Sequence, residues 1–127
     1  MKKILLVDDD ETIRSSMMAV LESAYEIKEA SSRAQARQTL KSYTPDLAIL
    51  DVMMETNDAG FELAREIKQN PALSNTKIIM YTSVDSELNI DFKSSAGDPD
   101  WLPVDEYLSK PVNPKLLIEA VKKLIGV

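Results

Sequence analysis

Short apolar runs alternate along the chain with stretches whose apolar residues recur at helical spacing. The runs are the length of a buried strand, and two of them, Ile4–Val7 and 46–50, end directly at aspartate. The run at 25–30 has mixed polarity, which is typical of a strand nearer the edge of a sheet. We therefore predict five strands, at 4–7, 25–30, 46–50, 77–81 and 106–109.

The stretches between these runs have the pattern of amphipathic helices. Ser31 and Ser32 are suitable caps for a helix that continues to about Tyr43. Asn113 followed by Pro114 is a favourable start for the last helix. The apolar positions predicted to face the core are Ile13, Met17, Val20 and Leu21 in the first helix, Leu63 and Ile67 in a helix over 60–69, and Leu117, Val121 and Leu124 in a last helix that ends near Gly126.

Strands that alternate with helices predict an α/β fold. Its core would be a doubly wound, five-stranded parallel sheet with helices on both faces. A length of 127 residues fits one domain, so we expect a single domain over residues 1–127. The segment 84–105 holds Gly97, Pro99 and Pro103, so any fourth helix there should be short or irregular.

Composition narrows the possible chemistry. The chain has no cysteine and no histidine, which excludes disulfides, thiolate catalysis, histidine-based catalysis and histidine-ligated zinc. A formal net charge of -6 argues against direct binding to nucleic acid. The apolar run after Met1 is too short for a secretory signal, and no run approaches the roughly 20 residues that a membrane span needs. We expect a cytoplasmic protein without membrane contact.

Polar residues follow four of the predicted strands: Asp8 with Asp9, then Asp51, Thr82 and Lys110. Each has an ordinary structural explanation, as a helix cap, a turn residue or a solvated charge. In a doubly wound sheet, however, the carboxyl ends of the strands form the site. Carboxylates gathered there would repel one another unless they were protonated or bound a cation. Oxygen ligands alone suit a hard ion such as Mg²⁺.

Such a set suits transfer of a phosphoryl group to a carboxylate. The nucleophile and the phosphoryl group are both anionic, so a metal ion and an ammonium group must offset their charge. A hydroxyl on a neighbouring strand can donate a hydrogen bond to a phosphoryl oxygen.

At this point the chain resembles the receiver domains of two-component response regulators, single-domain chemotaxis-type regulators among them. The resemblance covers the whole chain. It implies the flavodoxin-like strand order 2-1-3-4-5, which is one of the common strand orders of doubly wound α/β folds. The matching segments are Val7-Asp8-Asp9-Asp10-Glu11, Leu50-Asp51-Val52-Met53-Met54, Tyr81-Thr82-Ser83 and Tyr107-Leu108-Ser109-Lys110-Pro111.

The resemblance implies a role for each acidic position. Asp51 would be the phosphorylated residue. Asp9 and Asp51 would bind Mg²⁺, or Mn²⁺, directly, with the backbone carbonyl of Met53 as a third protein ligand. Asp8 would act through a bound water.

The resemblance also implies catalytic and switch residues. Lys110 and Thr82 would contact the phosphoryl group, and Thr82 would form a conformational switch together with Tyr107. The Lys110–Pro111 peptide would be cis.

Partners are expected from the same resemblance. The phosphoryl donor would be a sensor histidine kinase or a histidine phosphotransfer protein. No output domain is evident after the last helix, so we expect a downstream protein target, or a receiver excised from a longer chain. The protein would be a monomer or weak dimer that catalyses only its own phosphorylation and slow dephosphorylation.

Two segments depart from the family pattern. The loop after Met54 is longer than usual, and so is the stretch between Thr82 and Lys110, where we expect Trp101 to anchor a long loop. Met53 and Val84 lie two residues past Asp51 and Thr82, and their apolar side chains cannot orient a hydrolytic water. This is the basis for expecting slow dephosphorylation.

Three other functions are compatible with parts of the pattern. A receiver-like interaction module would keep the fold without being phosphorylated. A Mg²⁺-dependent aspartyl-phosphate phosphohydrolase would need an acid two residues past its nucleophile, where Asp51 has Met53, although Asp8 has Asp10. A flavodoxin-like binding module would need a phosphate cradle after the first strand, and the aspartates there would repel a phosphate.

Overall fold

The computed structural model describes residues 2–51, 59–82, 105–109 and 113–126, and the side chains of 59–61, 82, 107 and 109 are not described. A five-stranded parallel sheet lies at its centre, in the order β2-β1-β3-β4-β5. The predicted fold class and strand order are confirmed. The strands are β1 (Lys2–Val7), β2 (Tyr25–Ala30), β3 (Leu47–Asp51), β4 (Lys77–Thr82) and β5 (Glu106–Ser109).

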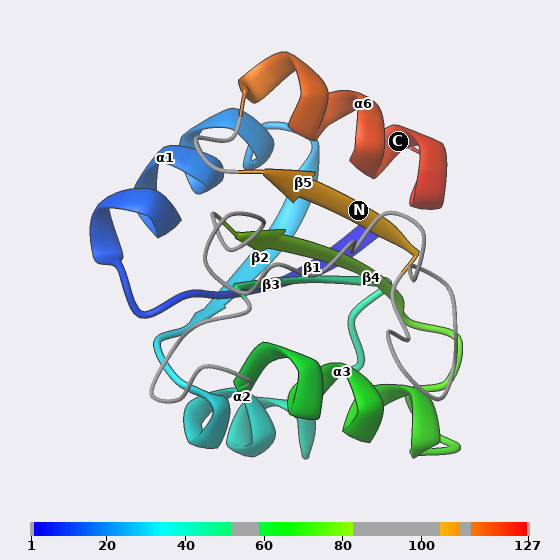
Figure 1. Ribbon diagram of the computed structural model, residues 1–127. Coiled ribbons are helices and arrows are strands. Elements are labelled where there is room, and N and C mark those ends of the chain that lie inside the picture. Colours follow the sequence, from blue (N-terminus) through cyan, green and yellow to red (C-terminus); the bar gives the residue numbers. More distant parts are fainter. Residues whose placement is uncertain (1, 52–58, 83–104, 110–112, 127) are drawn as a thin grey trace.

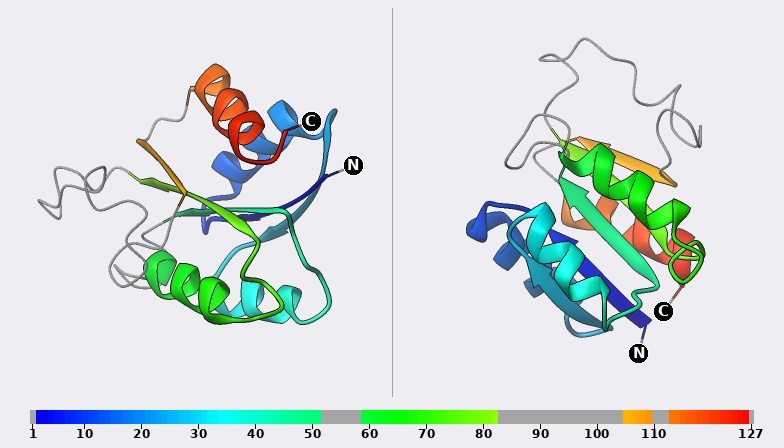
Figure 2. Two further views of the ribbon diagram at one scale, coloured as in Figure 1. Left: turned by 90° about the vertical axis from the view of Figure 1, so that its right-hand side faces the viewer. Right: turned by 90° about the horizontal axis from the view of Figure 1, so that it is seen from below.

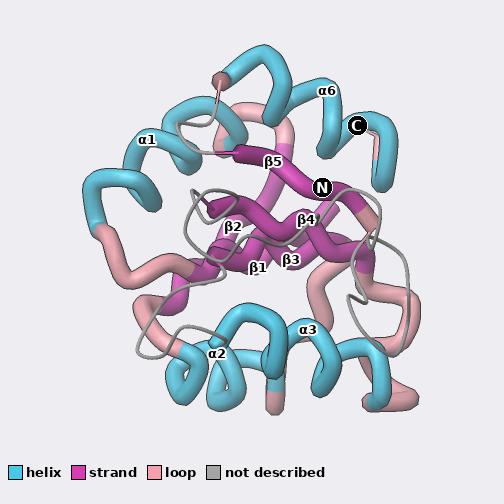
Figure 3. The backbone as a smooth tube through the Cα atoms, viewed as in Figure 1, coloured by secondary structure: helices cyan, strands magenta, loops and turns pink. Residues whose placement is uncertain are grey.

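Helices cover both faces of this sheet (Figure 1; Figure 3). The helices α1 (Glu11–Leu21) and α6 (Pro114–Ile125) lie on one face. The helices α2 (Arg33–Leu40) and α3 (Ala59–Gln69) lie on the other, and the view from the side shows the three layers clearly (Figure 2). The predicted fourth helix falls outside the described residues. No helix in the described part of the chain combines the length and apolarity needed to cross a bilayer.

Alternate residues of each central strand enter opposite cores, because successive side chains of a strand point to opposite faces. In β1, Leu5 and Val7 pack toward α2 and α3, whereas Ile4 and Leu6 pack toward α1 and α6. All five residues of β3 are buried. This burial on both faces explains why the strands appear in the sequence as continuous apolar runs.

The helix boundaries follow the predicted caps, with one exception. Ser32 caps α2 through the backbone N–H of Gln35, but the helix ends at Leu40 rather than near Tyr43. The N–H groups of Lys41 and Ser42 bond to carbonyls three residues back, which tightens and ends the last turn. Tyr43 then leaves the helix to be buried, with the ammonium groups of Lys3 and Lys28 5.6 and 5.1 Å from its ring centroid.

Asp105 attaches the start of β5 to β4. Its Oδ2 accepts a hydrogen bond from the backbone N–H of Ile78 at 2.8 Å and one from Lys68 Nζ at 3.1 Å. The backbone N–H of Asp105 donates in turn to the Ile78 carbonyl at 2.9 Å. Because Ile78 is fully buried, its N–H would have no replacement partner in water.

We predict that Asp105→Ala lowers the free energy of unfolding by about 1–3 kcal/mol, since it leaves a buried strand N–H unsatisfied. Asp105→Asn keeps an acceptor oxygen and loses only the charge opposite Lys68, so its loss should be smaller. Urea denaturation of both variants measures the difference. Equal losses would assign the effect to the ion pair, and an unchanged alanine variant would refute the proposed attachment.

Candidate functional site

Strand register places two aspartates and a tyrosine side by side at the carboxyl end of the sheet. Val7 is paired with Leu50, so Asp8, the next residue, lies beside Asp51. Asp51 is itself paired with Tyr81 on β4. Strand periodicity gives all three side chains the same face, which they share with α1 and α6.

The three predicted acidic residues converge. Asp8, Asp9 and Asp51 each offer a carboxylate oxygen, and these oxygens all lie within 4.8 Å of one another. Asp8 is 0% exposed and Asp51 3% exposed, while Asp9 is open to solvent. Three carboxylates this close form a strongly negative cluster, whose mutual repulsion a bound cation would relieve. An all-oxygen donor set is the kind that Mg²⁺ prefers, so the residues fit the expected ion.

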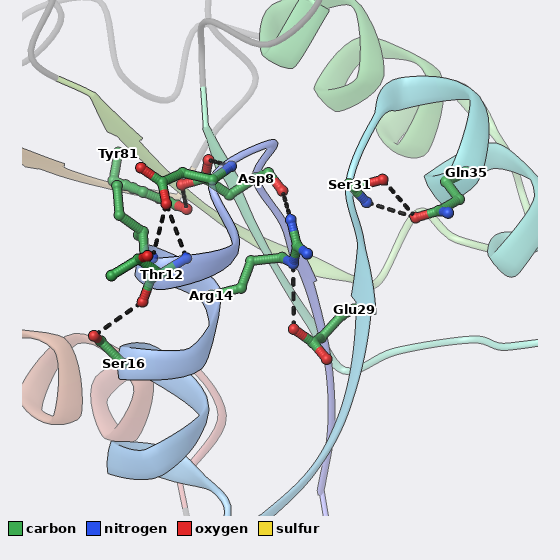
Figure 4. A network of polar contacts seen from close by, with 10 residues as sticks. Asp8, Thr12, Arg14, Ser16, Glu29, Ser31, Gln35 and Tyr81 are labelled. Carbon is green, nitrogen blue, oxygen red and sulfur yellow. Dashed lines mark hydrogen bonds and ion pairs between the residues drawn. The ribbon is translucent and has the colours of Figure 1, made fainter.

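The turn from β1 into α1 is held by hydrogen bonds around Asp8 (Figure 4). The Asp8 backbone N–H donates to the Ala30 carbonyl at 3.1 Å. Its carbonyl accepts from the Arg14 guanidinium at 2.5 Å, and Arg14 also forms an ion pair with Glu29 at 3.2 Å. These bonds fix the backbone from which both Asp8 and Asp9 project.

Asp10 has a different role from the two aspartates before it. Its Oδ1 accepts from the backbone N–H groups of Thr12 at 2.9 Å and Ile13 at 3.3 Å, which makes it the N-cap of α1. Its own N–H donates to Asp8 Oδ1 at 2.8 Å. Of the three consecutive aspartates, Asp8 and Asp9 therefore belong to the acidic cluster, and Asp10 caps the helix.

Tyr81 is part of the site, and the sequence reasoning missed it. Its hydroxyl donates to Asp8 Oδ2, and the side chain is fully buried (Figure 4). Burial raises the pKa of Tyr81 well above its ordinary value, and the negative charges of Asp8 and Asp51 raise it further. Tyr81 therefore stays protonated and remains a donor. The available signal was a tyrosine within an otherwise apolar strand, since a buried hydroxyl requires a partner.

The remaining predicted site residues are described only in part. Thr82 ends β4 in register with Ser109, and Tyr107 lies in β5, paired with Met80. Their backbones therefore lie at the predicted strands, but their side chains are not described. Met53, Lys110 and Pro111 lie outside the described residues, as does Trp101. Their predicted roles stay predictions.

Comparison with known proteins decides the family. The family model of the response regulator receiver domain matches the sequence of residues 4–122. The chain belongs to this family. Its fold and its aspartate cluster are those of a receiver domain of two-component signalling, and the cluster is consistent with phosphoryl acceptance and with Mg²⁺ binding.

Curated relatives of this receiver domain include both short and long proteins. It is 34% identical over 125 residues to the chemotaxis protein CheY of Halobacterium salinarum, covering 98% of this chain and 97% of the relative. It is 36% identical over 125 residues to the transcriptional regulatory protein GltR of Pseudomonas aeruginosa, covering 98% of this chain and 49% of that protein. The chain thus spans about half the length of the transcriptional regulator and nearly all of the chemotaxis protein.

Solved structures of response regulators have the same fold as this chain. A CheY-like receiver domain protein from Methanospirillum hungatei superposes with a TM-score of 0.80 at 29% identity, covering 97% of this chain and 92% of that one. The chemotaxis response regulator CheY4 of Vibrio cholerae superposes with a TM-score of 0.79 at 26% identity, covering 98% and 99%. Receiver domains of this family act in signalling, in which they interact with histidine kinases and with downstream targets.

The cap assigned to Asp10 leads to a prediction about stability. Asp10→Ala should lower the free energy of unfolding by about 1 kcal/mol, because two N–H groups of α1 lose their acceptor. Asp10→Ser supplies another capping oxygen and should recover most of that loss. Thermal or urea unfolding of the pair measures it. If serine and alanine were equally destabilised, Asp10 would not act as a cap.

Proposed function

We propose that this receiver domain, over residues 1–127, accepts a phosphoryl group on Asp51 in a reaction that depends on Mg²⁺ or Mn²⁺. The observation that carries the proposal is the convergence of Asp8, Asp9 and Asp51, with oxygens within 4.8 Å of one another at the carboxyl ends of β1 and β3. Membership of the receiver family supports it.

Each acid has a proposed part in binding the metal. Asp9 and Asp51 would ligate the ion directly, together with the backbone carbonyl of Met53. Asp8 would contribute through a bound water, which agrees with its deeper burial and with the protein donors on both of its oxygens. When bound, the ion would offset the charge of the carboxylates and of the incoming phosphoryl group.

The proposed reaction is a single phosphoryl transfer. An Asp51 carboxylate oxygen attacks phosphorus, and the bond from phosphorus to the donor breaks, a P–N bond in a phosphohistidine or a P–O bond in acetyl phosphate. The leaving group departs with the electron pair. Lys110 and Thr82 contact the phosphoryl oxygens. The domain is not an enzyme that turns over a separate substrate, and hydrolysis of its acyl phosphate is slow.

Signalling would follow from the same event. The donor is a sensor histidine kinase or a histidine phosphotransfer protein, and the output is contact with a downstream protein rather than direct binding to nucleic acid. Thr82 and Tyr107 would couple the phosphoryl group to that contact surface. The domain would work in the cytoplasm as a monomer or weak dimer.

The test is incubation of purified protein with acetyl phosphate and Mg²⁺, followed by intact mass spectrometry. Wild type should gain one phosphoryl group, and the gain should disappear with EDTA and in Asp51→Asn. Asp46→Asn is the matched control, because Asp46 lies just before the opposite end of β3 and accepts from the Lys3 backbone N–H at 2.8 Å. It should be phosphorylated normally.

The opposite result has a clear meaning. If wild type gained no phosphoryl group from acetyl phosphate or from a histidine-phosphorylated donor, the proposal would fail, and a receiver-like interaction module would be the better account. Equal phosphorylation of wild type and Asp51→Asn would move the acceptor to another residue.

A further inference from the structure

Arg14 of α1 joins the turn that carries Asp8 and Asp9 to the neighbouring strand β2. Its Nη1 donates to the Asp8 carbonyl at 2.5 Å, and its Nε donates to Glu29 Oε1 at 3.2 Å. The Arg14 side chain is 14% exposed, so most of it is shielded from solvent. Figure 4 shows the guanidinium between its two acceptors. Because a planar guanidinium holds its donors in a rigid fork, it restrains the Asp8 carbonyl relative to β2.

The carbonyl that Arg14 contacts belongs to the peptide unit between Asp8 and Asp9. A peptide unit is planar, so a restraint on this carbonyl also restrains the backbone nitrogen and Cα of Asp9. The Asp8 backbone N–H donates to the Ala30 carbonyl at 3.1 Å, which is a second link to β2. The turn is therefore restrained by β2 at two places, and Asp9, the exposed member of the acidic cluster, projects from it.

We propose that Arg14 is a positioning residue that orients the Asp8–Asp9 peptide for Mg²⁺ binding, with Glu29 as its anchor on β2. The inference rests on the proposed function, in which Asp9 and Asp51 ligate the ion. It goes beyond that function because it assigns part of the Mg²⁺ affinity to an ion pair whose two members are not ligands.

The charge of Arg14 by itself opposes the binding of a cation. Burial and the charges of Asp8 and Asp51 raise the pKa of Tyr81, whereas the charge of Arg14 acts to lower it, so this charge is felt at the hydroxyl that contacts Asp8. Loss of a positive charge beside a cation site should tighten cation binding by Coulomb's law. Loss of positioning should weaken it. The two explanations of Arg14 therefore predict changes of opposite sign.

The experiment is calorimetric titration of metal-free protein with Mg²⁺. Arg14→Met keeps an unbranched stem but removes the donors and the charge, and we expect its Mg²⁺ Kd to rise about tenfold, as for loss of a group that supports a metal ligand. Arg14→Lys keeps the charge on a single ammonium that cannot reproduce the fork, so its Kd should also rise. The lysine variant also keeps the test open if the methionine variant does not fold.

Amide hydrogen exchange of the metal-free proteins gives a second readout. The backbone N–H groups of Asp8 and Asp10 are both hydrogen-bonded within this turn. In Arg14→Met, exchange should become faster in peptides that cover residues 8–10 and stay at the wild-type rate in β3 and β4. A general loss of stability would instead raise exchange in the central strands as well.

Arg37→Met is the matched control. Arg37 of α2 forms an ion pair with Glu66 of α3, through Nε at 2.7 Å and Nη2 at 2.5 Å. The substitution makes the same change in net charge and also removes an ion pair, but between the helices on the sheet face opposite α1 (Figure 1). Its Mg²⁺ Kd and the exchange of residues 8–10 should equal those of wild type.

Each outcome is decisive. A Kd that is unchanged or lower in Arg14→Met, with wild type binding Mg²⁺, would overturn this inference and leave the proposed function intact. Wild-type affinity in Arg14→Lys would also overturn it, because the fork would then be unnecessary, and so would an equal weakening in Arg37→Met. If wild type bound no Mg²⁺ at all, the proposed metal-dependent function would fail together with the inference.

Discussion

Repulsion among three close carboxylates is the interaction on which the rest of this structure depends. At 4.8 Å, two unit charges repel by about 3 kcal/mol even with an effective dielectric constant near 20. Asp8 and Asp51 are both buried, so solvent relieves little of that cost. A charge-assisted hydrogen bond contributes about 1.5–3 kcal/mol. The donors from Asp10 and Tyr81 to Asp8 therefore offset part of this repulsion, and a bound cation would relieve more of it.

The fold supplies this arrangement through strand register and periodicity. The parallel strands β1 and β3 end at the same level of the sheet, because Val7 is paired with Leu50. Asp8 and Asp51, the residues that follow this pair, therefore lie side by side. Periodicity of two then sets both acids on the α1 and α6 face, opposite the core formed with α2 and α3. The α/β architecture thus produces a row of acids at one edge of an otherwise apolar sheet.

The fold class and the acidic cluster could be predicted from the sequence, because the central strands are buried on both faces and so appear as apolar runs that end at acids. The convergence of Asp8, Asp9 and Asp51 followed from the position of these acids at the carboxyl ends of neighbouring strands. Two features did not follow. The helix α2 ends at Leu40, and Tyr43 is buried beyond that end, which local helical spacing does not predict. The bond from Tyr81 to Asp8 joins residues 73 positions apart, so it becomes visible only when the strand register is known.

The central claim is that Asp51 carries the phosphoryl group as an acyl phosphate. Reduction with borohydride tests it at the level of the residue, because an aspartyl phosphate is converted to homoserine, whereas phosphoserine and phosphothreonine are not. Protein treated with a phosphoryl donor and Mg²⁺, reduced, digested and sequenced by mass spectrometry should contain homoserine at position 51. Homoserine at Asp8 or Asp9 instead, or at no aspartate, would contradict the account.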